Sequence, residues 1–197
     1  QYGVSVDGWL TPCDATDADG LEMGEGMLAG TPKSFTVGTD PAFFVKLIFK
    51  VTTIAGSDVI GVGFRKQGVY VDITTPSLAA SVYDDKALLM INDNAGNLVT
   101  VTSIGGADTT TELAHAVIAN GARWVGMKVM VSAAGAVTYT VGTSATSAAA
   151  CEAAMAADAS AVAMTITDGI ILVPYIPQVS TGSTMDLNLV IYECGLQ

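Results

Sequence analysis

The chain has 197 residues, enough for one domain with a full hydrophobic core. Its net charge is −11 and its eight Lys and Arg residues are scattered, so no basic patch is present to neutralise nucleic-acid phosphates or an anionic membrane surface. Half of the residues are hydrophobic, yet no apolar run reaches the roughly 20 residues that cross a bilayer, and we expect neither nucleic acid nor membrane as a partner.

Residues 1–40 are acidic and rich in glycine, and they show little periodicity. This composition predicts an irregular N-terminal arm, followed by a single β-sandwich domain at residues 41–197. The arm carries apolar side chains, and such a segment packs on its own domain or on a neighbour. We therefore take five of them as candidate partner-binding residues: Tyr2, Trp9, Leu10, Leu21 and Met23.

The arm contains the acidic stretch DATDADG at residues 14–20. An EF-hand loop has Asp or Asn at its first, third and fifth positions, Gly at its sixth and Glu at its twelfth. With Gly20 at the sixth position, the first position falls on Ala15 and the twelfth on Gly26. The loop pattern therefore fails twice, and we expect a solvated acidic turn, with no metal and no cofactor.

From Phe43 onward the pattern becomes that of β-strands. The sequence FFVKLIFKVTTI at residues 43–54 alternates apolar and polar residues after Val45. Hairpin patterns follow at residues 58–73, 86–104 and 123–142, and two further strands are predicted at 170–177 and 185–196. About nine or ten short strands joined by turns predict an all-β antiparallel sandwich or barrel.

Two short helices interrupt the strands. The sequence TTTELAHAVIANG at residues 109–121 has a capping box formed by Thr109 and Glu112. The sequence SAAACEAAMAADAS at residues 147–160 is rich in alanine, the best helix former.

No catalytic set is found in the sequence. The single histidine, His115, has no partner in a recognisable motif, and no G-x-S-x-G sequence occurs. Asp84 and Asp85 are adjacent, so they point to opposite faces of a strand and cannot flank a glycosidic bond. The three cysteines, Cys13, Cys151 and Cys194, lack metal-ligand spacing and are expected to be buried. We therefore expect no catalytic residue and no enzymatic activity.

The segment RWVGMKVMVSAAGAVTYTVG at residues 123–142 resembles a hairpin of the concanavalin-like jelly rolls, the laminarin-hydrolase and LamG-type proteins. FFVKLIFKV near residue 43 is similar to their early core strand, and MDLNLVIYECG near the C-terminus to their closing strand. This resemblance implies a jelly-roll β-sandwich. The catalytic acids and metal ligands of that family have no matching motif here.

In composition and layout the chain also resembles the decoration, or cement, proteins of tailed-phage capsids. That resemblance implies a non-enzymatic virion protein on the outer capsid surface. Its partners would be the major capsid protein and copies of itself in a homotrimer, and it would stabilise the shell by binding only the assembled form.

Two other functions remain open from the sequence. One is a carbohydrate-binding module or adhesin on the same β-sandwich, which needs exposed aromatic and amide side chains. Trp9 and Trp124 are the tryptophans available for stacking, and Trp124 lies in a strand pattern that predicts the core. The other is a hydrolase with an unrecognised site, which the lack of paired acids disfavours.

Overall fold

The computed structural model describes residues 3–5, 8–10, 20–23, 33–53, 59–68, 83–91, 98–113, 123–158, 163–179 and 186–197. Of these, residues 3–5, 8–10 and 20–23 are described by their backbone alone.

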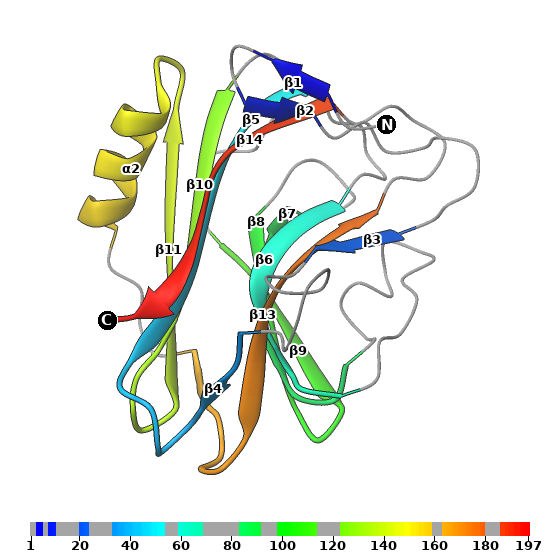
Figure 1. The fold of residues 1–197 in the computed structure, drawn as a ribbon, viewed down its shortest axis with the longest axis vertical. Coiled ribbons are helices and arrows are strands. Elements are labelled where there is room, and N and C mark those ends of the chain that lie inside the picture. The colour runs from blue at the N-terminus through cyan, green and yellow to red at the C-terminus, as the bar shows by residue number, and fades with distance from the viewer. Residues whose placement is uncertain are drawn as a thin grey trace.

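Two antiparallel sheets pack face to face (Figure 1). Sheet A has seven strands in the order β1 (Gly3–Ser5), β2 (Gly8–Leu10), β14 (Asp186–Leu196), β5 (Phe43–Thr53), β10 (Arg123–Val131), β11 (Ala136–Ser144) and β12 (Met164–Thr165). Sheet B has the order β3 (Gly20–Met23), β13 (Ile171–Val179), β6 (Val59–Lys66), β7 (Lys86–Ile91), β8 (Leu98–Ile104) and β9 (Ala107–Glu112), and β4 (Phe35–Thr36) also pairs with β13. The expected jelly-roll β-sandwich is confirmed.

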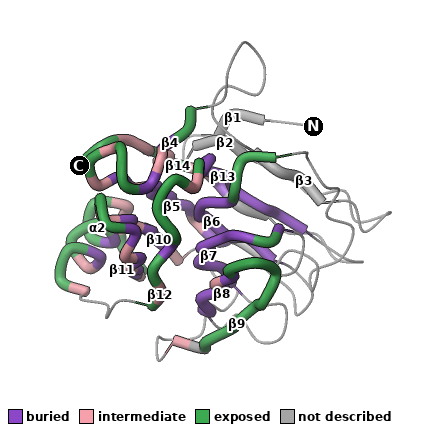
Figure 2. The backbone as a smooth tube through the Cα atoms, turned by 90° about the horizontal axis from the view of Figure 1, so that it is seen from below, coloured by how far each residue is buried: buried purple, intermediate pink, exposed green. Residues whose placement is uncertain are grey.

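The core lies between the two sheets, because each strand alternates its side chains between the inner and outer faces. In β5, Val45, Leu47 and Phe49 are fully buried in this core. Phe35 and Phe43 stack with ring centroids 4.6 Å apart, and Phe64 meets both rings edge-on. Each such side chain stabilises the fold by about 1.5–3 kcal/mol. Figure 2 shows the buried segments gathered where the sheets face each other.

The N-terminal residues differ from the expected irregular arm. β2 pairs with β14, where Trp9 lies opposite Leu189, and β3 pairs with β13, where Met23 lies opposite Ile176. The described parts of residues 1–23 are therefore strands at one end of each sheet, since their backbone groups find partners there. Tyr2 lies outside the described residues, and the partner-binding role of all five arm residues stays a prediction.

The expected helix beginning at Thr109 is wrong at its start, because residues 107–112 form strand β9. Gly105 and Gly106 both have positive φ, 60° and 82°, and make a two-residue hairpin turn that returns the chain along β8. The threonines at 109–111 are β-branched and suit this strand, which overrides the capping-box pattern. His115 lies outside the described residues.

The alanine-rich helix is confirmed as α2 (Ala148–Ala157). Ser147 caps its N-terminus, where the side-chain oxygen accepts a hydrogen bond from the Ala150 N–H at 3.1 Å. Figure 1 shows α2 on the side of sheet A that faces away from sheet B. No helix among the described residues is long and apolar enough to cross a membrane.

Candidate functional site

The candidate site is a pocket of about 350 Å³ between the outer face of sheet A and α2. Its volume lies within the range of roughly 300–1,000 Å³ that ligand sites occupy. We call it the helix-side pocket and define it by its lining residues: Lys46, Lys128, Met130, Thr140, Glu152, Met155, Ala156 and Asp158.

Two glycines set the distance between helix and sheet. Gly126 of β10 and Gly142 of β11 are register partners, and Cys151 and Met155 of α2 pack directly over them. A Cβ atom at Gly126 would lie 2.1 Å from the Met155 Sδ. The part of α2 from Cys151 to Met155 therefore lies close to the sheet, and the pocket opens beside Met155.

Lys46 of β5 links the sheet to the helix. Its Nζ lies 2.6 Å from Glu152 Oε1 on α2 and 2.9 Å from Glu193 Oε2 on β14. Burial by itself lowers the pKa of Lys46, but the hydrogen bonds and charges of the two glutamates outweigh it and the pKa is raised. Lys46 thus stays charged, and its charge is compensated within the protein.

Lys128 of β10 lies beside Lys46 in register but has different surroundings. Its Nζ lies 4.7 Å from the centroid of the Phe44 ring. Among the described residues, no carboxylate forms an ion pair with this ammonium group. Burial lowers the pKa of Lys128, the neighbouring Lys46 lowers it further, and Glu193 offsets only part of the effect.

The rest of the lining is both polar and apolar. The Thr140 hydroxyl can donate and accept hydrogen bonds, and Met130 and Met155 provide apolar surface. Asp158 follows the last turn of α2, and its Oδ2 accepts a hydrogen bond from the Val141 N–H at 2.8 Å. The pocket therefore offers donors, acceptors and apolar contact on a rigid sheet, which suits a polar ligand with several hydroxyl groups.

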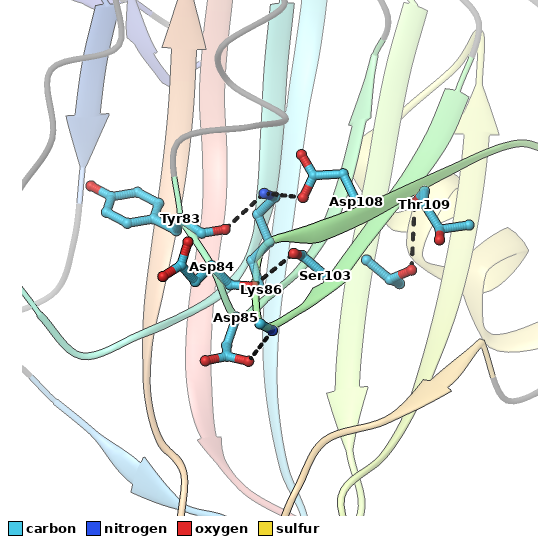
Figure 3. Close-up of polar contacts among 9 residues, drawn as sticks. Tyr83, Asp84, Asp85, Lys86, Ser103, Asp108 and Thr109 are labelled. Atoms are coloured by element: carbon cyan, nitrogen blue, oxygen red, sulfur yellow. Dashed lines mark hydrogen bonds and ion pairs between the residues drawn. The ribbon is translucent and has the colours of Figure 1, made fainter.

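A second polar cluster lies on the outer face of sheet B (Figure 3). Lys86 is fully buried, and its Nζ donates to the Tyr83 carbonyl at 2.8 Å and to Asp108 Oδ1 at 2.7 Å. The Arg65 guanidinium lies 4.4 Å from the centroid of the Tyr83 ring, and that ring meets Tyr175 edge-on. Because these charged groups pair with other groups of the protein, we assign the cluster a role in stabilising the fold.

Asp84 and Asp85 lie beside this cluster, and their carboxyl groups point apart (Figure 3). The expectation that they lie on opposite faces of a strand is wrong, because both form a bend just before β7. Asp85 is buried, accepts a hydrogen bond from the Gly105 N–H at 2.9 Å, and pairs with Lys66 at 3.0 Å. Asp84 is exposed, and its carbonyl oxygen accepts from the Ser103 hydroxyl at 2.6 Å. Through these hydrogen bonds the two residues stabilise the hairpin turn between β8 and β9.

Several residues singled out in the sequence lie elsewhere. Trp124 does not enter the core between the sheets: it is half-buried on the outer face of sheet A, with the Lys50 Nζ 5.6 Å from its ring centroid. Cys151 is buried, and its Sγ donates to the Gly142 carbonyl at 3.1 Å. Cys13 and residues 14–19 lie outside the described residues.

Two kinds of site are not found within the described ranges. No three His, Cys, Asp or Glu side chains come together there as a metal site. In the described part of the chain, the large hydrophobic side chains that are exposed are all aliphatic: Ile104, Ile171, Val190 and Leu196. These ranges therefore present no fully exposed aromatic ring that could stack on a sugar.

Sequence reasoning missed the residues of the helix-side pocket. The signal available was the pair Lys46 and Lys128, each a lysine with apolar residues on both sides in the sequence. The register that places them side by side follows from the three-dimensional arrangement, and so do the ion pairs that the two glutamates form with Lys46.

No family model matches this sequence, and no curated protein matches it either. Solved structures do share its fold. An alginate lyase from Pseudomonas aeruginosa has a TM-score of 0.60 at 9% identity, covering 100% of this chain and 86% of its own.

Two carbohydrate-binding structures are similar as well. The carbohydrate-binding module CBM66 from Bacillus subtilis has a TM-score of 0.55 at 7% identity, covering 98% of this chain and 90% of its own. The Emp47p carbohydrate recognition domain has a TM-score of 0.56 at 10% identity, covering 98% and 85%. At such identities the likeness shows a shared fold alone.

Proposed function

We propose that this chain is a non-catalytic carbohydrate-binding protein that takes up a sugar in the helix-side pocket. The observation that carries this proposal is the lining of the pocket, which combines ammonium, carboxylate and hydroxyl groups with two methionine side chains. Sugar hydroxyls both donate and accept hydrogen bonds, and the C–H faces of a sugar ring pack on apolar surface.

The fold adds independent support. Structures with the same sandwich include a carbohydrate-binding module, a carbohydrate recognition domain and alginate lyases. Catalysis by such a fold needs a positioned acid and base. In the helix-side pocket, Glu152 is paired with Lys46, and Asp158 accepts the Val141 N–H. Because both carboxylates already have partners in the protein, we expect the pocket to bind a sugar without cleaving it.

A blocked pocket tests the proposal. Ala156 is exposed on α2 and lines the pocket, so Ala156→Trp places a large ring there without disturbing the core. Glycan-array screening of the unaltered protein identifies the sugar, and calorimetry then measures its affinity. We expect Ala156→Trp to weaken binding at least tenfold, because the ring occupies the volume of the ligand.

The matched control is Ala153→Trp, which adds the same ring to an exposed position of α2 outside the pocket lining. It should bind like the unaltered protein. If no glycan binds, or if the two variants bind equally well, the proposal is wrong. Release of unsaturated or reducing ends from alginate or other polysaccharides would contradict the non-catalytic part.

The capsid decoration function is a second candidate, favoured by one specific observation. The N-terminal strands lie at the edge of both sheets: β1 is outermost in sheet A and β3 in sheet B among the described strands. Edge strands offer unpaired backbone groups to another chain. In this proposal they contact the major capsid protein on the outer capsid surface, and the protein acts as a homotrimer.

Removing residues 1–5 tests this second candidate, because it deletes β1 and leaves β2 paired with β14. We expect the shortened protein to stay folded and to lose cosedimentation with capsids. Sedimentation equilibrium of the intact protein should give three times the mass of the chain. A monomer, or undiminished capsid binding after removal of residues 1–5, would contradict it.

A further inference from the structure

We propose that the helix-side pocket selects sugars that carry a carboxylate, as uronic acids do, and that Lys128 binds this carboxylate. The inference rests on the proposed carbohydrate-binding function and names the class of sugar. It begins from a difference between Lys46 and Lys128, which lie side by side on the outer face of sheet A: Lys46 forms ion pairs with two glutamates and Lys128 forms none with the described residues.

The first step is the charge balance around each lysine. Lys46 has two carboxylates within 2.9 Å, Glu152 and Glu193. Lys128 is its register partner on β10 and lines the same pocket, yet none of the described carboxylates pairs with it. Among the described residues, Lys128 is therefore the pocket cation that has no direct carboxylate partner and whose ammonium can pair with the carboxylate of a ligand.

The second step is the local electrostatic environment. Lys128 is half-buried, and burial together with the neighbouring Lys46 lowers its pKa. A lowered lysine pKa means that the surroundings disfavour the positive charge, and an added anion relieves that penalty. The protein's overall charge of −11 acts against an anion from a distance, but physiological salt screens such charges beyond about 8 Å.

The third step concerns the rest of the ligand. The pocket volume of about 350 Å³ is far larger than an isolated carboxylate group requires. Thr140, Met130 and Met155 provide the hydroxyl and apolar contacts that a sugar ring uses. Glu152 and Asp158 also line the pocket and repel a ligand with several charges, so a ring with one carboxylate fits best.

Three probes separate the parts of this inference: glucuronate, glucose and acetate. Glucose has the ring without the carboxylate, and acetate has a carboxylate without the ring. We expect glucuronate to bind about tenfold more tightly than either of them in an NMR or calorimetric titration, because a charge-assisted contact adds to the ring contacts.

Variants at Lys128 locate the effect. Lys128→Gln should abolish the preference for glucuronate over glucose, and Lys128→Arg should retain it because the charge remains. The control is Lys50→Gln, which removes a positive charge from the same face of sheet A outside the pocket lining and should keep the preference.

The outcomes are distinct. If glucose and glucuronate bind equally, the inference is wrong and the carbohydrate-binding function stands. If acetate binds as tightly as glucuronate, the pocket is a general carboxylate site and the sugar part fails. If none of the protein's titrations with sugars or glycan arrays shows binding, the proposed function and this inference fail together.

Discussion

Gly126 and Gly142 lie opposite one another on neighbouring strands, and Cys151 and Met155 of α2 lie over the space that their missing side chains leave. A Cβ atom at Gly142 would lie 2.3 Å from the Cys151 carbonyl oxygen and 2.7 Å from the Met155 nitrogen. Both are backbone atoms of the helix, so they cannot give way by a side-chain rotation.

We therefore expect Gly142→Ala to lower the free energy of unfolding by about 1–3 kcal/mol through overpacking. Urea denaturation followed by circular dichroism measures the change. No atom of the described residues lies within 4 Å of a Cβ added at Gly68, so Gly68→Ala is the control and should be neutral. Equal stabilities of the two variants would show that α2 does not rest tightly on the sheet.

The Lys86 and Asp108 pair predicts an asymmetry between two substitutions. Lys86 is fully buried, whereas the Asp108 side chain keeps 27% of its exposure. Asp108→Ala leaves a buried cation without its carboxylate and should cost about 3–5 kcal/mol. Lys86→Met leaves a carboxylate that water can reach and should cost less than half as much. Chemical denaturation of both variants checks this order, and a reversed order would contradict it.

Asp85 predicts a pH dependence. Burial raises the pKa of Asp85, but the Gly105 N–H and Lys66 outweigh this effect and hold it below the usual 3.8. A lowered pKa stabilises the folded state above the unfolded value, and the effect disappears as the pH falls through the folded pKa.

Asp85→Asn should therefore lower stability by about 1.5 kcal/mol at pH 7. The difference from the unaltered protein should shrink as the pH falls below 3.8. Thermal unfolding between neutral and acid pH tests this. Asp84→Asn changes an exposed carboxylate and serves as the control, with a shift within about 0.5 kcal/mol. A pH-independent difference would rule out the titration of Asp85 as its cause.

Cys151 is expected to resist thiol reagents in the folded protein. It has no solvent exposure, and burial, aided by the nearby Glu152, raises its pKa to about 11. The thiolate is the reactive form, so little of it exists at pH 8. Labelling with iodoacetamide, followed by peptide mass spectrometry, should leave Cys151 unmodified until denaturant is added. Modification at the same rate with and without urea would contradict the packing of α2.

The alternation in the sequence predicted the strands well because the buried face of a sheet needs an apolar residue at every second position. Residues 43–53 illustrate this, since Val45, Leu47 and Phe49 enter the core and Lys46 does not. The helix α2 could also be predicted from the sequence, because the high helix propensity of its alanines and the N-cap residue Ser147 both indicate a helix at this position.

Other features depended on contacts between distant residues. The Thr109 and Glu112 pattern suited a helix, but pairing with β8 made the segment a strand. The helix-side pocket could not be predicted, because it requires the register of β5 and β10 and the position of α2 together. The N-terminal glycines suggested irregularity, and only the partners β13 and β14 show where that backbone pairs.

The pairing of β2 with β14 brings residues 9–10 against residues 188–189. During synthesis, these early residues leave the ribosome long before their partners exist. Sheet A is therefore completed only after residue 189 has emerged, and contacts so far apart along a chain form slowly. A nascent chain stalled before that point has a sheet edge whose backbone N–H and C=O groups lack a partner strand, and such an edge favours chaperone binding and aggregation.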